Sequence, residues 1–164
     1  AGGLQDSMPL TLWDPDHGKM DAVYDISRTI EKVLRPKVWL RGGGYLIIQP
    51  TEALIAIDVN TGKAISKKKD VEKTFLKVNM EAVEEIARQL RLRNLSGMIL
   101  IDFIDMKEKE HREELMHILR MDLKKDKVPA TLVDITRLGL VELTRKKVQK
   151  SLKEQLQGDV SDEK

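Results

Sequence analysis

Two short apolar runs, each closed by an aspartate, place the strongest constraint on how this chain can fold. The runs are "ALIAID" at 53–58 and "MILID" at 98–102. Between them, after Asp70 as the expected N-cap, apolar residues recur on one helical face at Val71, Phe75, Val78, Ala82 and Ile86. A helix of this length can serve as the crossover that brings a second strand beside the first. The sequence therefore predicts a strand, helix, strand unit of the α/β class.

The remaining patterns predict one layered α/β domain, with a mixed β-sheet flanked by helices. On the N-terminal side they indicate a helix from about 21 that Pro36 stops, a short strand "KVWL", and an antiparallel hairpin of "YLIIQ" and "ALIAIDV" joined by "PTE". On the C-terminal side, "MILIDFIDM" predicts a strand buried on both faces. It is followed by a helix over about 108–124, a strand "ATLVDI", a shorter strand or turn "LGLVEL", and a basic amphipathic helix "TRKKVQKSLKEQL".

Length and composition bound the domain count and exclude several kinds of protein. The 164 residues suit one ordinary domain, which we expect over 21–156, with a tail or tether at 1–20 and a polar tail at 157–164. The content of 41% hydrophobic and 34% charged residues is typical of a soluble globular protein. The absence of cysteine excludes disulfides, cysteine zinc sites and cysteine nucleophiles. The longest apolar run, "ALIAI" at 53–57, is too short to cross a bilayer, and so is "MILI" at 98–101.

The aspartates that end the two runs are the candidate reactive groups. Ligands of open α/β sheets usually bind at the carboxyl ends of strands, so Asp58 and Asp102 converge if their strands are neighbours. Two ionised carboxylates so close repel unless a cation lies between them or one is protonated. Oxygen ligands favour Mg²⁺, with Mn²⁺ as a substitute, and such a site suits phosphate-ester chemistry. Asn60 would project to the same side as Asp58, and Asp105 would lie in the surroundings of the metal ligands.

The residues alone leave other interpretations open. An aspartate just past a strand also forms turns or caps helices. Three basic clusters, "KKK" at 67–69, "KKDK" at 124–127 and "RKKVQK" at 145–150, can attract phosphate, although each by itself is typical of a solvated surface. "RGGG" lacks the Lys-Ser/Thr that a phosphate-binding P-loop requires.

Three longer segments resemble a known family. "GGYLIIQPTEALIAIDVNTGK", "NMEAVEEIARQLRLRNLSGMILIDFIDM" and "LGLVELTRKK" closely resemble the catalytic core of the ribonuclease E/G family, its DNase I-like subdomain, in the order found there. The resemblance runs from about Asp21 to Leu152 and implies a Mg²⁺-dependent endoribonuclease. Such enzymes cut single-stranded, often A/U-rich RNA and leave 5′-phosphate and 3′-hydroxyl ends. Members process RNA precursors and begin mRNA decay in the bacterial cytoplasm, and relatives occur in chloroplasts.

Carried over by position, the resemblance implies roles for particular residues. The two metal-ligating aspartates fall on Asp58 and Asp102, and the asparagine that bonds near metal and substrate falls on Asn60. The implied reaction is attack of a metal-activated water or hydroxide on a backbone phosphate, with the same ion neutralising the developing charge. Residues expected to contact the RNA backbone are Lys63, Lys67, Lys68, Lys69, Arg88, Arg91, Arg93 and Arg145. The arginines of "ARQLRLR" can equally well be surface or ion-paired residues that do not contact RNA.

The chain also departs from the family pattern. No S1 RNA-binding domain or 5′-phosphate sensor fits within the first 20 residues, and no Cys-Pro-x-Cys zinc link follows the core. We therefore expect weakened substrate capture, no zinc, and a homo-oligomer only of a kind that zinc does not link. Val128, Pro129 and Ala130 stand where a basic residue commonly helps to bind the RNA 5′ end, and the loop "TGKAISKKKD" lacks the usual paired glycines.

Two functions are consistent with these observations. Retention of Asp58, Asn60 and Asp102 favours an endoribonuclease core. The missing regions favour a non-catalytic or weakly active RNA-binding or assembly module of the same fold.

Overall fold

A computed structural model describes residues 12–14, 16, 18–63 and 70–158. The predicted lysines 67–69 lie outside this described part. The contacts within the chain define two compact units, residues 1–33 and 34–164.

The helix expected to end at Pro36 is interrupted. It consists of α1 (Met20–Tyr24) and α2 (Ile26–Leu34), separated by Asp25, whose backbone is left-handed with φ 52°. The Asp21 carboxylate accepts hydrogen bonds from the Ser27 amide (2.7 Å) and hydroxyl (2.9 Å), which stabilise the turn between the helices. Neither helix contains a buried residue.

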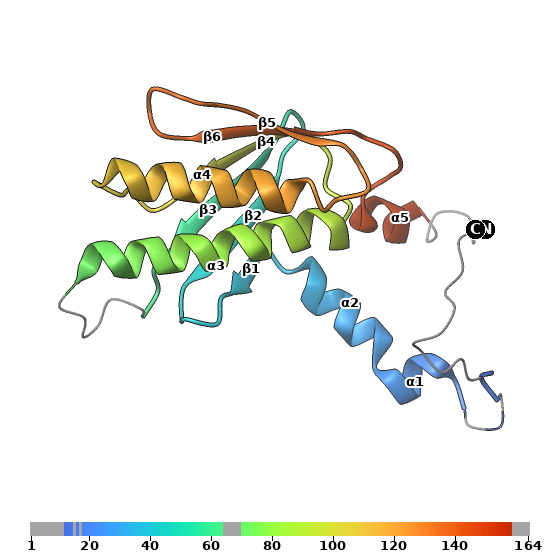
Figure 1. The fold of residues 1–164 in the computed structure, drawn as a ribbon. Helices are drawn as coiled ribbons and strands as arrows, with labels where there is room; N and C mark the ends of the chain where they lie inside the picture. The colour runs from blue at the N-terminus through green and yellow to red at the C-terminus, as the bar shows by residue number, and fades with distance from the viewer. Residues whose placement is uncertain (1–11, 15, 17, 64–69, 159–164) are drawn as a thin grey trace. The chain divides into compact units, whose positions relative to one another are not determined.

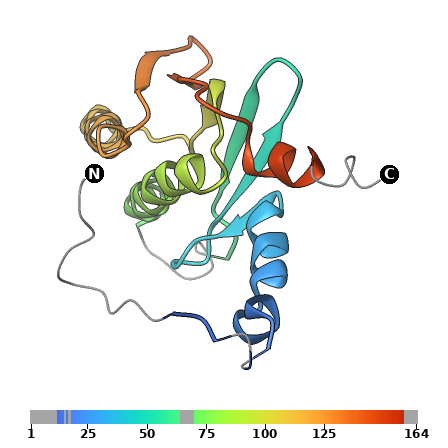
Figure 2. The same cartoon turned by 90° about the vertical axis from the view of Figure 1, so that its right-hand side faces the viewer.

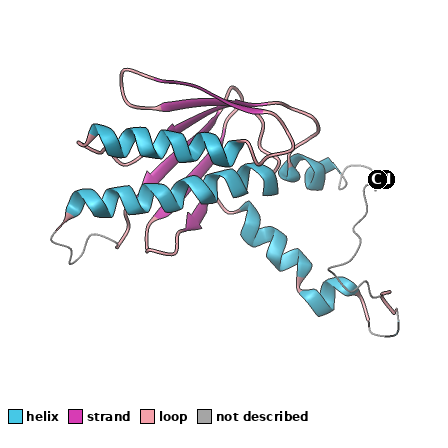
Figure 3. Ribbon diagram, in the orientation of Figure 1, coloured by secondary structure: helices cyan, strands magenta, loops and turns pink. Residues whose placement is uncertain are grey.

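The larger unit contains a six-stranded mixed sheet (Figures 1 and 3). Its strands lie in the order β1-β2-β3-β4-β6-β5. Their bounds are β1 (Lys37–Trp39), β2 (Tyr45–Pro50), β3 (Ile55–Asn60), β4 (Gly97–Asp102), β5 (Ala130–Ile135) and β6 (Val141–Arg145). Strands β3 and β4 pair in parallel, and the other neighbours pair antiparallel. The α/β class, the mixed sheet and the β2–β3 hairpin are confirmed.

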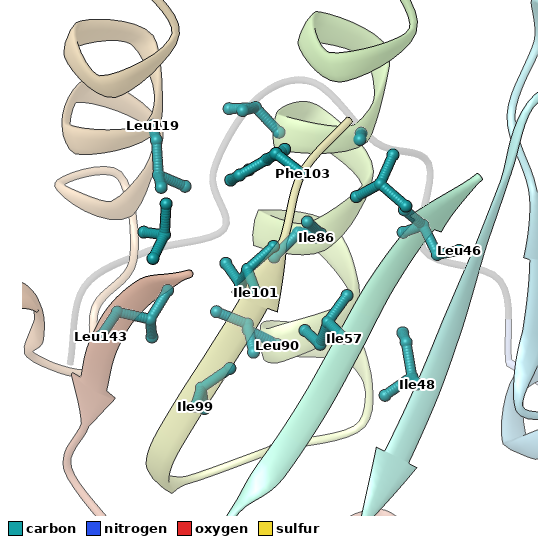
Figure 4. Packing of buried hydrophobic residues seen from close by; sticks show 14 of the residues in the cluster. Leu46, Ile48, Ile57, Ile86, Leu90, Ile99, Ile101, Phe103, Leu119 and Leu143 are labelled. Carbon is teal, nitrogen blue, oxygen red and sulfur yellow. The ribbon is translucent and has the colours of Figure 1, made fainter. Parts of the chain in front are cut away.

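Helices α3 (Val71–Leu92) and α4 (Lys109–Leu123) lie side by side on one face of the sheet (Figure 2). The predicted N-cap of α3 is confirmed, because the Asp70 carboxylate accepts a hydrogen bond from the Lys73 amide (3.2 Å). Apolar side chains of both helices pack against alternate residues of the strands (Figure 4). Ile86, Ile99 and Ile101, all fully buried, lie within this core. The crossover α3 thus fixes β4 beside β3.

Two predictions about the fold are wrong in detail. Strand β4 is not buried on both faces: Ile99 and Ile101 are fully buried, whereas Met98 is 48% exposed, because α3 and α4 pack on the opposite face. The basic helix expected from 144 begins only at Leu152, as α5 (Leu152–Gly158). Residues through Arg145 instead belong to β6, which pairs with both β4 and β5. Tertiary pairing has overridden the local helical preference.

A paired-aspartate site at the carboxyl ends of two parallel strands

The aspartates that close the two apolar runs are direct partners in the sheet. In the parallel pairing of β3 and β4, Ile57 lies opposite Ile101 and Asp58 opposite Asp102. Both isoleucines are buried on the helix-covered face, whereas both aspartates are exposed. Because side chains alternate along strands, the core anchors that precede the aspartates direct both carboxylates to the same opposite face. The predicted convergence of Asp58 and Asp102 is therefore present.

Asn60 lies on the same side of β3 as Asp58. Its side-chain amide Nδ2 donates a hydrogen bond of 2.6 Å to Asp58 Oδ2. The bond fixes the orientation of the Asp58 carboxylate and occupies one of its oxygens, so Oδ1 is the oxygen more open to another ligand. The structure thus joins the three residues that the sequence singled out.

The electrostatics of this site disfavour two charged carboxylates without a counter-ion. Partial desolvation raises the pKa of Asp102, and the negative charges of Asp58 and Asp105 raise it further. All three aspartates line one shallow depression, with Thr61 and Phe75 at its border. Their hard oxygen donors fit a divalent cation such as Mg²⁺, which needs only one or two protein carboxylates. Within the described ranges, no three acidic or histidine side chains form a closed metal cage.

A glycine turn supports the β3 side of the site. Gly62 follows Asn60 closely and has φ 53°, and a Cβ there would lie 2.3 Å from the Gly43 carbonyl oxygen. The Lys63 amide donates to that same oxygen (3.3 Å), and the Gly42 amide donates to the Glu81 carboxylate (2.7 Å). The close backbone approach requires glycine at 62. It ties the end of β3 to the β1–β2 turn and to α3.

A buried asparagine of α3, which was not predicted from the sequence, supports the β4 side. Asn79 is fully buried; its Nδ2 donates to the Ile104 carbonyl (2.8 Å) and its Oδ1 accepts from the Ile104 amide (3.0 Å). One side chain thus satisfies both backbone groups of Ile104, which lies between Asp102 and Asp105 in the chain. The available signal was a polar residue next to Val78 on the inward stripe of the helix.

The predicted RNA-contact residues that the structure describes are not brought together. Lys63 is exposed and lies three residues beyond Asn60, at the site end of β3. Arg88 is exposed and its guanidinium is paired with the Glu85 carboxylate at 2.6 Å. Arg91 is exposed, but it lies about 24 Å along α3 from Phe75, at a rise of about 1.5 Å per residue.

Arg93 and Arg145 are buried and have structural partners instead. Arg93 donates to Gln89 Oε1 (2.5 Å) and to the Arg35 carbonyl (2.9 Å). Arg145 Nε donates to Asp126 at 2.8 Å, and the two side chains are only 3% and 5% exposed. Such burial prevents direct contact with an RNA phosphate, so the expectation of RNA contacts from Arg93 and Arg145 is corrected. Arg145 lies opposite Gly97, at the amino end of β4, away from the aspartates.

Fold and site together define an α/β domain with a two-aspartate, one-asparagine site at the carboxyl ends of adjacent parallel strands. The sequence model of the Ribonuclease E/G family matches residues 6–148, and the chain belongs to this family. It is 44% identical over 136 residues to Ribonuclease G of Salmonella typhimurium (strain SL1344), which covers 83% of this chain and 28% of that protein.

Further relatives show the same partial coverage. Identity to Ribonuclease G of Escherichia coli (strain K12) is 45% over 130 residues, 79% of this chain and 26% of that protein. Identity to Ribonuclease E of Nostoc sp. (strain PCC 7120) is 45% over 124 residues, 76% of this chain and 18% of that protein. The chain thus spans little more than a quarter, or less, of the length of these relatives. None of the helices in the described part of the chain is long and apolar enough to cross a membrane.

Proposed function

We propose that this chain is the catalytic core of a metal-dependent endoribonuclease. Its reaction is hydrolysis of phosphodiester bonds in single-stranded, A/U-rich RNA to 5′-phosphate and 3′-hydroxyl ends, in RNA processing and decay in the bacterial cytoplasm. The observation that supports it best is the register of Asp58 against Asp102, with Asn60 bonded to Asp58, in a member of a ribonuclease family. Such a carboxylate pair has a clear use in holding a cation beside a phosphate.

Each residue of the site has a role in this proposal. Asp58 and Asp102 would hold Mg²⁺, for which Mn²⁺ could substitute, and Asn60 keeps the Asp58 carboxylate oriented. A cation bound there would lower the pKa of a bound water molecule and would neutralise negative charge on the phosphoryl oxygens. Asp105 lines the same depression and adds negative charge near Asp102, but it is not part of the β3–β4 strand pair. We therefore place it in the surroundings of the metal ligands. Lys63, at the site end of β3, is a candidate for contact with the RNA backbone.

A second candidate function is a non-catalytic RNA-binding or assembly module. One observation favours it: the chain corresponds to a minor part of the length of its relatives. A module without catalysis has no physical need for two converging carboxylates, since their repulsion costs stability. We therefore place the endoribonuclease first.

The experiment that separates these functions is an RNA cleavage assay. The purified chain is incubated with single-stranded A/U-rich RNA in Mg²⁺ and in EDTA, beside the variants Asp58→Asn and Asp102→Asn. We expect cleavage by the wild type only with Mg²⁺, and a loss of roughly a hundredfold or more in rate for each variant, because each removes a charge needed in the transition state. Mapping of the product ends tests for 5′-phosphates.

Glu52→Gln is a suitable control, since Glu52 is an exposed carboxylate at the β2–β3 turn, at the other end of the hairpin from Asp58. Equal cleavage by the wild type and both aspartate variants would refute the catalytic proposal. Binding of RNA without any cleavage by the wild type would favour the module.

A further inference from the structure

A groove adjoins the aspartate site on the side of α4. It has a volume of about 780 Å³ and lies between α4, the segment that follows β4, and the turn of the β5–β6 hairpin. In Figure 1 this hairpin turn and the start of α4 lie at the same end of the sheet. The floor includes the buried Phe103 and Val141, and the walls include the half-buried Met116 and the exposed Ile135. The groove is large enough to hold part of an extended ligand.

The groove is continuous with the depression that holds the aspartates. Phe103, Ile104 and Asp105 line both. Gly139 of the hairpin turn lies near the junction, since a Cβ there would be 3.9 Å from Asp105 Oδ1. A linear molecule bound at the paired aspartates can therefore continue into the groove.

The charge of the groove favours a polyanion. Its lining includes four cationic side chains, Lys109, Arg112, Arg120 and Arg137, and two carboxylates, Asp105 and Glu113. Two of the cations are engaged: Lys109 pairs with Glu113 (3.3 Å), and Arg112 donates to the Met106 carbonyl (2.7 Å).

Arg120 and Arg137 are the cations available to a ligand. Both are exposed, and the side chain of neither forms a hydrogen bond or ion pair with another residue that the structure describes. They come from opposite walls, one from α4 and one from the hairpin turn. Guanidinium groups placed in this way can contact successive phosphates of a backbone.

We propose that this groove binds the nucleotides of single-stranded RNA that adjoin the scissile phosphate, with Arg120 and Arg137 contacting backbone phosphates. This inference rests on the proposed endoribonuclease function. Of the Phe, Tyr and Trp side chains, the described lining contains only Phe103, which is 9% exposed, so the exposed His117 is the one ring there that can stack on a base. Stacking is a main source of base contact in single-strand sites, so the groove should track the backbone with little base preference.

The test is a binding measurement that does not depend on catalysis. A fluorescein-labelled, A/U-rich single-stranded RNA is titrated with the chain in EDTA, and anisotropy is followed over a series of salt concentrations. The variants are Arg120→Ala, Arg137→Ala and the double substitution. Lys153→Ala is the matched control, because Lys153 is exposed and lines the hollow at the opposite ends of β3 and β4.

We expect each single variant to weaken binding roughly threefold at low salt and the double variant roughly tenfold. In the double variant the slope of log affinity against log salt should become shallower by about 1.4, at about 0.7 per lost phosphate contact. The control should bind like the wild type. All four variants alter exposed side chains and should fold, which circular dichroism checks.

Three results would overturn the proposal that RNA binds in the groove. They are equal RNA affinity of the double variant and the wild type, an equal loss of RNA affinity in Lys153→Ala, or no RNA binding by the wild type. The same proteins are then assayed for cleavage in Mg²⁺. If the wild type binds RNA through the arginines but does not cleave it, the catalytic proposal fails and the groove stands. If the double variant cleaves and binds like the wild type, the groove fails and the catalytic proposal stands. Preferential capture of an acidic peptide over RNA would assign the groove to a protein partner and overturn the proposal.

Discussion

At the scale of single residues, Arg145 illustrates how the structure changes the meaning of a charged side chain. Its guanidinium bonds not only to Asp126 but also to Asn94 Oδ1 (2.9 Å) and the Leu95 carbonyl (3.0 Å). It therefore joins the end of β6 to the loop before β4 and to the loop after α4. A phosphate contact needs an exposed guanidinium, whereas this one stabilises the fold.

Removal of this guanidinium should destabilise the protein strongly. Arg145→Met leaves the Asp126 carboxylate buried without its ion partner, which typically costs about 3–5 kcal/mol in the free energy of unfolding. Urea denaturation at neutral pH measures the loss. Lys147→Met, which removes an exposed cation paired to Glu154 at 3.8 Å, should change stability little. An Arg145→Met variant with native stability and reduced RNA affinity would restore the original prediction.

The same ion pair gives a pH dependence with a definite sign. Burial alone would raise the pKa of Asp126, but hydrogen bonds from Arg145 and from the Val128 amide lower it overall. Because the pKa of Asp126 is lower in the folded state, its ionised carboxylate stabilises the protein at pH values above the unfolded-state pKa of about 3.9. This stabilisation is lost as the pH falls through the folded-state pKa. The stability difference between the wild type and Arg145→Met should therefore shrink in acid.

Residue patterns predicted Asp58 and Asp102 but not the place of Arg145, for a physical reason. The aspartates end apolar runs, and the helix between those runs allows the parallel pairing that the structure shows, with Asp58 opposite Asp102. Arg145 lies in a basic cluster, and its burial depends on Asp126 and Asn94, which lie 19 and 51 residues away. No local pattern encodes such distant partners.

At the scale of elements, α3 both buries the core and positions the segment after β4. Asn79→Ala removes both hydrogen bonds to Ile104 and leaves its backbone groups without their partner, at a cost of about 1–3 kcal/mol. Asn79 is a positioning residue, because its side-chain hydrogen bonds go to the Ile104 backbone. We expect lower cleavage rate and a higher half-saturating Mg²⁺ concentration, with RNA affinity in EDTA unchanged.

Gln89→Ala provides the matched control. Gln89 is buried in the same helix and bonds to Glu85 (2.7 Å) and Arg93 (2.5 Å), near the helix end remote from the aspartates. Its loss should reduce stability by a similar amount without changing the Mg²⁺ dependence of cleavage. If both variants shift the Mg²⁺ requirement equally, Asn79 acts only through overall stability.

Element boundaries were predictable where a local signal sets them. The α3 start follows from the Asp70 cap, whose carboxylate takes up a free amide of the first turn. The predicted helix from 144 failed because Arg145 is the end of a strand held by two neighbours, and α5 could begin only after the chain left the sheet. Sheet pairing is a long-range property, so it is weakly encoded in any single window.

At the scale of the whole molecule, the site lies where two halves of the sheet meet. The strands β1-β2-β3 form one antiparallel half and β4-β6-β5 the other, and the parallel β3–β4 pair joins them. Asp58 belongs to the first half and Asp102 to the second. A cation shared by both carboxylates should therefore stabilise the junction as well as serve chemistry.

Thermal unfolding tests this link between binding and folding. At a Mg²⁺ concentration of about ten times the dissociation constant, a site present only in the folded state adds about 1.4 kcal/mol. For a domain of this size that corresponds to a rise in Tm of about 3–6 °C. EDTA should abolish the rise, and Asp58→Asn and Asp102→Asn should lack it. Amide hydrogen exchange should slow in β3 and β4 of the wild type alone.

The cation-free protein should behave in the opposite way. Because the pKa of Asp102 is raised in the folded state, the folded protein binds its proton more tightly than the unfolded chain does. Ionisation of Asp102 at neutral pH therefore costs stability, and Asp102→Asn in EDTA should unfold at a slightly higher temperature than the wild type. The difference should vanish below the unfolded aspartate pKa of about 3.9, where both states are protonated. If Mg²⁺ raised the Tm of the wild type and of both asparagine variants equally, the ion would bind elsewhere. Binding between the paired carboxylates predicts both effects together, because the repulsion that destabilises the cation-free protein is the repulsion that the cation removes.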